Sequence, residues 1–419
     1  MKLVKMSLLA ATLIASSAFA IDNVKVSGDA KLYYSTNDAE ILDGASGEEI
    51  SGLFAQPSSA GQAALGLGLT ADLTEGISAG LHMTAISTLG LENNLVANVW
   101  EGGLTDEFWF DEAWLAGTVG KTTGKIGRMT LDTPLVFTET WSIAKNTFEA
   151  AVLLNQDISD TTLVAAYVGA SNGSETQGGF GLGSVTASWD GSQNSNFASF
   201  YDGAYAFGAV NNSWKPLTVQ AWYYQVQHIA SAYWLQADYA SDFGLTLGAQ
   251  YTGVDLADAL APTGDKGNTA LALMAGYEMK DTFTVSAAYS QTDKNDNDLG
   301  AGFNVAASGQ SKLYTEAWWN YGYITQQDTS AFNVTATTPE ELTWAQLGLY
   351  LTQSTGKDGV AVGTDLEMTE VTLSASKSFG PLDTSLVYIM TDATDQNIKA
   401  GDTEGSAYNT VQAYLTYNF

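Results

Sequence analysis

The chain has 419 residues, a formal net charge of −30 from 46 acidic and 16 basic residues, and 42 glycines, 20 tyrosines and 11 tryptophans. So large an excess of negative charge excludes nucleic acid as a partner, because a polyanion would be repelled. The absence of cysteine excludes a disulfide framework, a thiol nucleophile and a zinc–thiolate site.

The first predicted element is a secretory signal peptide over residues 1–20. Lys2 and Lys5 precede an apolar run, and residues 18–20 form a cleavage site of the A-x-A type. We expect a mature chain that begins at Ile21, and the loss of two lysines takes its formal net charge from −30 to −32. No run of about 18 apolar residues follows the signal peptide, so no transmembrane helix is predicted. The exported chain is therefore either soluble or a β-barrel of the outer membrane.

Alternating apolar and polar residues predict strands along the rest of the chain. In the stretch 245–252 every second residue is apolar, and such segments are about ten residues long, which suits tilted strands that cross a bilayer. Short turns such as 72–76 alternate with long acidic loops such as 171–198, as in outer-membrane barrels with short periplasmic turns. We therefore predict an all-β fold, a transmembrane antiparallel β-barrel of eighteen strands. Sixteen strands is the alternative, because residues 313–350 are the hardest to assign.

The predicted strands cover residues 24–34, 61–73, 77–87, 107–119, 124–130, 147–156, 161–170, 201–211, 217–227, 232–240, 244–254, 269–279, 282–292, 312–321, 341–353, 369–379, 382–392 and 408–419.

The stretch GRMTLDTPLVFTETWS, residues 127–142, interrupts this pattern. Pro134 removes a backbone donor and ends strand pairing there. The apolar residues 135–137 and Trp141 would not remain in water on an external loop. We expect them to pack the loop against the inside of the barrel; the alternative is a surface loop that meets a neighbouring protomer.

Charged side chains on and after this stretch form the predicted pore constriction. Asp132 and Glu139 are its acids, and Lys145 follows them. The single arginine, Arg128, has two alternatives. It sets a transverse field opposite the acids, or it extends to a membrane interface, because strict pleating puts it on the face of Ile126. The predicted constriction comprises Arg128, Asp132, Glu139, Trp141 and Lys145.

Strand parity places further charged side chains on the inner face of the predicted wall. With the acidic loops they would form a negative vestibule, whose field extends over roughly a Debye length, about 8 Å at physiological salt. We therefore predict a mild preference for cations. The predicted pore-wall residues are Asp29, Lys31, Glu112, Asp238, Glu278 and Glu316.

The sequence favours neither catalysis nor a resident metal. His82 and His228 are the only histidines, and no Ser-His-Asp arrangement accompanies them. The segment TDKNDND, residues 292–298, has acids at calcium-like spacing. However, Asp298 replaces the glycine that an EF-hand turn needs, and no glutamate follows at the closing position. We expect a solvated loop there rather than a Ca²⁺ site, no cofactor and no enzyme.

Several stretches carry a family resemblance. In AYLTYNF, residues 413–419, apolar residues alternate back from Phe419, which resembles the assembly signal of outer-membrane barrels. With GRMTLDTPLVFTETWSIAKNTF, LTVQAWYYQVQ and AYWLQADYAS, the order of segments resembles the Campylobacter-type major outer membrane porins and their OprD-like relatives. The resemblance implies an eighteen-stranded barrel, a homotrimer, and a third extracellular loop, from Thr130 to about Asn146, folded into the lumen. The chain departs from OprD-like channels in having few basic residues to supply their ladder of positive charge.

These observations leave three functions for an exported barrel in the lipid bilayer of the bacterial outer membrane. The main prediction is a porin for passive diffusion of ions and small hydrophilic solutes, mildly cation-preferring. The alternatives are a substrate-specific OprD-like uptake channel and a structural or adhesive surface barrel.

Overall fold

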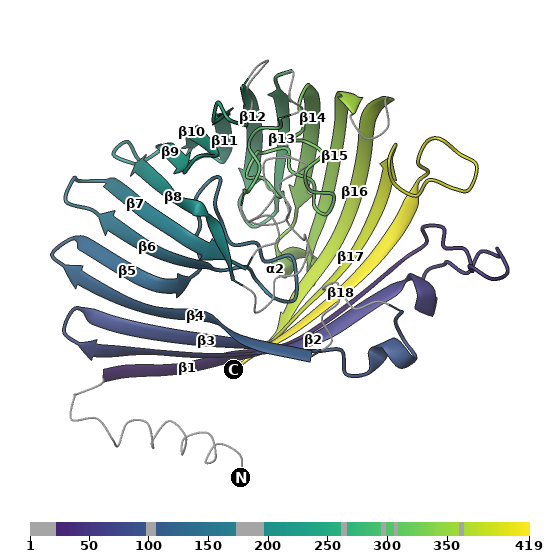
Figure 1. The fold of residues 1–419 in the computed structure, drawn as a ribbon, viewed down its shortest axis with the longest axis horizontal. Helices are drawn as coiled ribbons and strands as arrows, with labels where there is room; N and C mark the ends of the chain where they lie inside the picture. Colours follow the sequence, from purple (N-terminus) through teal and green to yellow (C-terminus); the bar gives the residue numbers. More distant parts are fainter. Residues whose placement is uncertain are drawn as a thin grey trace, which may run out of the picture.

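The computed structural model describes residues 22–97, 106–172, 197–260, 266–294, 299–305, 309–359 and 364–419. The predicted signal peptide lies outside these residues. Within them, eighteen strands pair antiparallel in chain order, and β1 (Asp22–Asn37) pairs with β18 (Tyr408–Asn418), which closes the sheet into a barrel (Figure 1). Closure leaves no unpaired sheet edge, as a sheet that crosses a bilayer requires. The prediction of an eighteen-stranded antiparallel barrel is confirmed, and the alternative of sixteen strands is excluded.

Between β1 and β18 lie β2 (Ser59–Thr74), β3 (Ile77–Ser87), β4 (Asp106–Val119), β5 (Thr122–Met129), β6 (Phe148–Asn155), β7 (Thr161–Ser171), β8 (Ala198–Asn211), β9 (Leu217–Val226), β10 (Ala230–Ala240), β11 (Leu245–Leu256), β12 (Gly267–Met279), β13 (Phe283–Thr292), β14 (Thr329–Thr337), β15 (Gln346–Gly359), β16 (Thr364–Phe379) and β17 (Leu382–Ala393).

Two short 3₁₀ turns, η1 (Gln56–Ser58) and η2 (Leu91–Asn93), lie in the loops that follow β1 and β3, and a single helical turn, α2 (Glu340–Thr343), joins β14 to β15. No helix in the described part of the chain is long and apolar enough to cross a membrane.

One predicted strand is wrong. Residues 312–321 do not belong to the wall; the fourteenth strand is β14, which pairs with β13 through contacts such as Val285 with Ala336. The segment around residues 312–321 lies inside the barrel, where its apolar and polar side chains find partners on the inner wall. The alternation of apolar and polar residues in 312–321 therefore reflects packing inside the lumen, and it resembles the alternation of a wall strand with one face in water.

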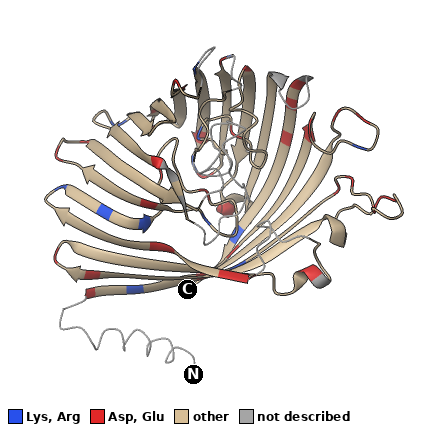
Figure 2. Cartoon of the chain, viewed as in Figure 1, with Lys and Arg blue, Asp and Glu red and all other residues tan. Residues whose placement is uncertain are grey.

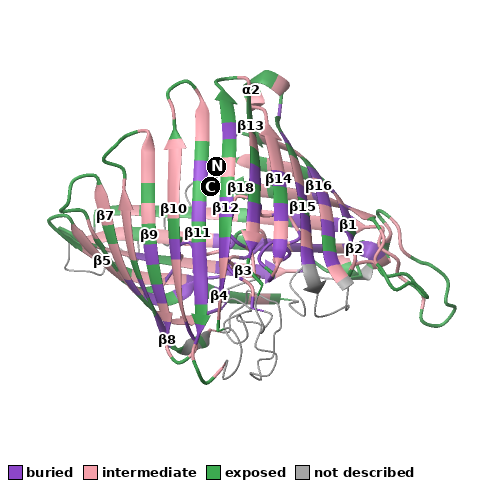
Figure 3. Cartoon of the chain, turned by 90° about the horizontal axis from the view of Figure 1, so that it is seen from above, coloured by how far each residue is buried: buried purple, intermediate pink, exposed green. Residues whose placement is uncertain are grey.

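Period-two alternation separates the two faces of the wall. On β12 the side chains of Leu271 and Leu273 are 45% and 50% exposed, whereas those of Ala270 and Ala272 are 1% and 0% exposed. The exposed apolar set faces outward, and the buried set meets chain that fills the barrel. Figure 3 shows bands of exposed, intermediate and buried residues along the strands of the wall.

The two ends of the barrel differ. Connections at the end that carries both termini are short, such as residues 120–121 and 380–381, whereas most of those at the other end are long. Acidic residues outnumber basic ones along the described strands and loops (Figure 2). The terminal Phe419 exchanges two backbone hydrogen bonds with Gly28, of 2.8 and 2.9 Å, and so fixes the closing seam at the terminal end.

Candidate pore constriction

The chain between β5 and β6, residues 130–147, folds into the barrel and is called the first inner segment. Leu135 and Val136 are each 4% exposed and belong to one apolar cluster with inward residues of β7 to β10, including Ala206 and Trp234. The backbone N–H of Leu135 also donates to the hydroxyl of Tyr224, at 3.4 Å. These contacts confirm the prediction that this loop packs against the inside of the wall.

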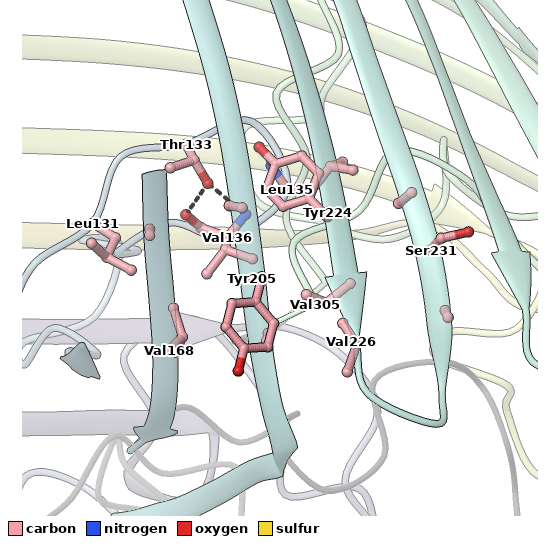
Figure 4. A pocket seen from close by; sticks show the side chains of 15 residues that line it. Leu131, Thr133, Leu135, Val136, Val168, Tyr205, Tyr224, Val226, Ser231 and Val305 are labelled. Atoms are coloured by element: carbon pink, nitrogen blue, oxygen red, sulfur yellow. Dashed lines mark hydrogen bonds between the residues drawn. The ribbon is translucent and has the colours of Figure 1, made fainter. Parts of the chain in front are cut away.

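Side chains of the first inner segment and of β7 to β10 line the seam between that segment and the wall (Figure 4). The Thr133 hydroxyl donates to the carbonyl of Val136 at 2.6 Å, and the Val136 N–H donates back to that hydroxyl at 3.2 Å, which makes a tight turn. The gap that remains against β7 to β10 is about 30 Å³, enough for roughly one water. The seam therefore holds the loop in place and is not a solute site.

A second stretch also enters the barrel. Residues 293–328, which join β13 to β14, form the second inner segment; residues 295–298 and 306–308 of it lie outside the described part. The two inner segments bind each other. The side-chain amide of Asn304 accepts from the N–H of Phe137 at 3.2 Å and donates to its carbonyl at 2.9 Å, and the N–H of Val305 donates to the carbonyl of Leu135 at 3.1 Å.

Glu139 lies at this junction. It is 1% exposed, and its carboxylate accepts from the Asn304 side chain at 2.8 Å and from the indole N–H of Trp141 at 2.7 Å. Trp141 in turn contacts two rings of the second inner segment, with centroids 6.0 Å away for Trp319 and 6.2 Å away for Tyr321. Glu139 therefore fixes the orientation of Trp141 in the lumen.

The second inner segment is anchored to the wall by Glu370 of β16, a residue that the sequence did not single out. Its side chain is 1% exposed. The carboxylate accepts from the backbone N–H groups of Trp318 at 2.8 Å, Trp319 at 3.1 Å and Asn320 at 2.8 Å, and from the Asn320 side chain at 2.7 Å. A carboxylate that receives this many donors holds a stretch of loop firmly.

Glu112 and Lys145 meet in an ion pair on the inner side of β4, and Asp111 lies 3.9 Å from the same ammonium. Asp111 is 1% exposed and also contacts Nδ1 of His82, at 2.6 Å. Parity alone would put Asp111 and Glu112 on opposite faces. A register shift between β3 and β4 at this point turns both of them inward, because a bulge adds one residue to one strand.

Arg128 lies on the outward face of β5, and its guanidinium stacks on the ring of Phe197, 3.6 Å from the ring centroid. β5 pairs with β4 only from Ala113 onward, since the chain leaves the wall after Met129. The pairing of β5 with β4 therefore stops short of the part of β4 before Ala113, which leaves a notch in the wall. Arg128 covers this notch by donating to the carbonyl of Phe110 at 2.5 Å and to Glu149 of β6 at 2.6 Å. This corrects its placement in the constriction: unbroken pleating keeps it on the face of Ile126, where it bridges three strands.

The other predicted residues have these positions. Asp132 is on the first inner segment, 91% exposed, and pairs with Lys312 of the second. Asp238 is on the inner face of β10 and accepts from the Tyr314 hydroxyl. Asp29 and Lys31 form a 3.4 Å ion pair on β1, and Glu278 is exposed near the terminal end of β12, on the face of Ala270 and Ala272. Glu316 is not a wall residue, because it belongs to the second inner segment.

A chamber of about 580 Å³ remains between the inner segments and the wall formed by β14, β15, β17 and β18. Seven aromatic rings with half-buried side chains line it: Trp141, Tyr314, Trp318, Trp319, Tyr321, Tyr350 and Tyr414. Glu316 also lines it, and burial raises the pKa of its carboxyl to about 8. A second hollow of about 550 Å³, beside α2 at the terminal end, shares Ser385 and Tyr414 with the chamber. Together they outline a path along this side of the lumen.

Among the described residues no group of three His, Asp or Glu side chains could hold a metal ion. The sequence TDKNDND falls partly outside those residues, at 295–298.

Comparison with known proteins gives one family and many similar folds. A family model described as an outer membrane porin of the OprD family matches residues 21–330. The fold is similar to Pseudomonas aeruginosa OccK8 (OprE), with a TM-score of 0.69, 14% identity and coverage of 96% of this chain and 99% of that one. It is also similar to Pseudomonas aeruginosa OccK2 (OpdF), with a TM-score of 0.70, 12% identity and coverage of 95% and 98%. A third similar structure, Acinetobacter baumannii OccAB4, has a TM-score of 0.65, 10% identity and coverage of 94% and 98%. No curated protein matches the chain.

Proposed function

Since the chain belongs to the OprD family of outer membrane porins, we propose that it is a selective uptake channel for small hydrophilic solutes, with a preference for cations. It is a β-barrel channel of the bacterial outer membrane and not an enzyme. Selective uptake replaces general diffusion, the main prediction from the sequence, as the proposed function.

The observation that carries this proposal is the junction of the two inner segments. An eighteen-stranded barrel is wide enough for an open aqueous channel. Here Asn304 and Phe137 tie two segments together inside the barrel, and the cavity that both segments line is about 580 Å³ and surrounded by aromatic rings. A cavity of this size fits one small molecule and contacts most of its surface. Contact with the solute, rather than its size alone, would then decide its passage.

The proposed cation preference rests on the charges that meet the lumen. Lys145 and Lys312 are each paired with an acid, Glu112 and Asp132 respectively. Further inward carboxylates, such as Asp238 and the exposed Glu278, add negative charge. Like charges on a pore wall raise the local concentration of counter-ions. The cation preference is tested by the reversal potential measured across a planar bilayer in a salt gradient. A reversal potential with the sign expected for an anion-selective pore would overturn the proposal.

Liposome swelling separates the candidate functions. Purified protein is reconstituted, and swelling rates are measured for sugars, amino acids and small amines of graded size. Rates that depend on chemical class at equal size support selective uptake. A smooth fall with size alone supports general diffusion, and no swelling with any solute supports a structural or adhesive barrel.

We also propose a homotrimer. β5 and β6 have only eight residues each, and the wall beside them carries an outward hollow of about 740 Å³ with the Arg128–Glu149 ion pair in it. The wall is short here and carries charge on its outer face. Burial of this stretch against another copy of the chain would remove the charge from lipid, where exposed charge is costly. Light scattering in detergent tests the assembly: a monomer mass at all concentrations contradicts it.

A further inference from the structure

We propose that the aromatic chamber binds organic cations that lack a carboxylate group, such as quaternary ammonium compounds. This inference rests on the proposed channel function and names the solute class that the chamber would select. Its basis is the arrangement of rings, the absence of basic side chains from the described lining, and the carboxylates behind the rings.

The rings come from four parts of the chain and are tilted toward one another. Trp141 meets Trp319 at an interplanar angle of 88°, and Trp318 meets Tyr350 of β15 at 42°, with centroids 4.6 Å apart. Tilted rings present both faces and edges to the space between them, unlike a flat stack. The negative faces of such rings attract a cation that lies within about 6 Å of their centroids.

No lysine or arginine is among the described residues that line the chamber. The nearest basic residue on the second inner segment, Lys312, lies over the ring of Phe137, 4.7 Å from its centroid, and pairs with Asp132. An anionic solute would therefore find no cation to replace its hydration. A solute with both an ammonium and a carboxylate would find a partner only for the first.

Two carboxylates lie behind the rings of the chamber. Glu139 accepts the indole N–H of Trp141, and Glu370 accepts the backbone N–H groups of Trp318 and Trp319. These bonds hold the rings and place negative charge behind them, and an acceptor on an indole N–H polarises the ring in the sense that strengthens its hold on a cation. Glu316 lines the chamber itself, but burial raises the pKa of its carboxyl to about 8, so it adds negative charge only above neutral pH. The negative charge behind the rings and the polarised indole ring of Trp141 both disfavour the binding of anions.

Choline and its uncharged isostere dimethylbutanol test this directly, because the two have the same shape and differ in charge. We expect choline, added to wild-type channels in planar bilayers, to reduce the potassium current in a saturable manner, and dimethylbutanol to have no effect. Glycine betaine, which adds a carboxylate to the same ammonium, is expected to bind at least tenfold more weakly than choline. Equal block by choline and the isostere would overturn the proposal, as would block by a neutral sugar without block by choline, which would assign the rings to saccharides.

Variants locate the site. Trp319→Ala is expected to weaken choline binding about tenfold, the effect of one partly desolvated cation–π contact. Trp141→Phe keeps a ring and is expected to lose no more than about threefold. Trp214→Ala is the matched control, because Trp214 is 61% exposed in the turn between β8 and β9. Equal affinity in wild type and Trp319→Ala would refute the site.

The two levels of the proposal fail differently. If the reconstituted protein passes no potassium current at all, the channel function is refuted. If potassium passes and choline neither blocks nor crosses, the channel function stands and the aromatic cation site is refuted.

Discussion

Replacing Glu370 by alanine should release the second inner segment while the wall stays intact. The carboxylate accepts four N–H groups from residues 318–320, and the side chain is 1% exposed. Hydrogen bonds to a charged group contribute about 1.5–3 kcal/mol each. We expect a loss of about 3 kcal/mol rather than the full sum, because lumen water resolvates part of the freed donors. A loss of that size increases the detached population about a hundredfold.

Limited trypsin digestion of the channel in liposomes measures this population. Lys312 lies on the second inner segment, so cleavage after it reports detachment, and its rate follows the open population when opening and closing are fast. We expect cleavage about a hundredfold faster in Glu370→Ala and an intermediate rate in Glu370→Gln, which keeps one carbonyl acceptor.

Two controls complete the test. Glu278→Gln removes an exposed inward carboxylate from another part of the wall and should leave the cleavage rate unchanged. Gel mobility before and after heating should show an intact barrel in every variant. The reasoning is refuted if Glu370→Ala is cleaved no faster than Glu278→Gln.

Further substitutions probe the notch and the chamber. Arg128→Gln should destabilise the barrel by about 1–2 kcal/mol, seen as a lower temperature of gel-mobility shift, and leave ion selectivity unchanged; a change in the sign of selectivity would place it in the pore after all. Gly127→Ala should destabilise it more, because its φ is +116° and an added Cβ would lie 2.3 Å from the Ala113 carbonyl oxygen. The Glu316 carboxyl, with its pKa raised to about 8, loses its proton between pH 7 and 9, so cation preference should increase over that range. Glu316→Gln should abolish this increase, and an unchanged pH profile in that variant would contradict the assignment.

The wall was predictable because its pattern is local. Each strand shows the two-residue period over its own length, and closure follows once an even number of such strands is joined by short and long connections. The failure at residues 312–321 has a physical cause. Trp318 and Trp319 are neighbours in sequence, and the side chains of both line the chamber, because Glu370 holds their segment through its backbone N–H groups. Periodicity does not register that kind of contact.

The inward course of the loop after β5 was predictable in part. Pro134 and the apolar residues after it indicated an inward loop, and Glu139 and Trp141 are indeed inside the barrel. Asp111 was missed because a single bulge changes the face of one residue. For Arg128 the sequence left two alternatives, the pore constriction and the membrane interface, because its surroundings depend on where the pairing of β4 with β5 ends. The bulge at Asp111 and the point at which a strand leaves the wall are both set by pairing between strands and not within one strand.

The ties between Asn304 and Phe137, and the anchor at Glu370, have a consequence for how such channels diversify. The hydrogen-bond ladders that close the barrel run through the strands, and none of the described residues of either inner segment belongs to one of those strands. Substitutions in the inner segments therefore alter the lining of the passage with little effect on barrel assembly. A scaffold divided in this way can be given a different interior, by selection or by grafting, while its exterior remains matched to the same membrane.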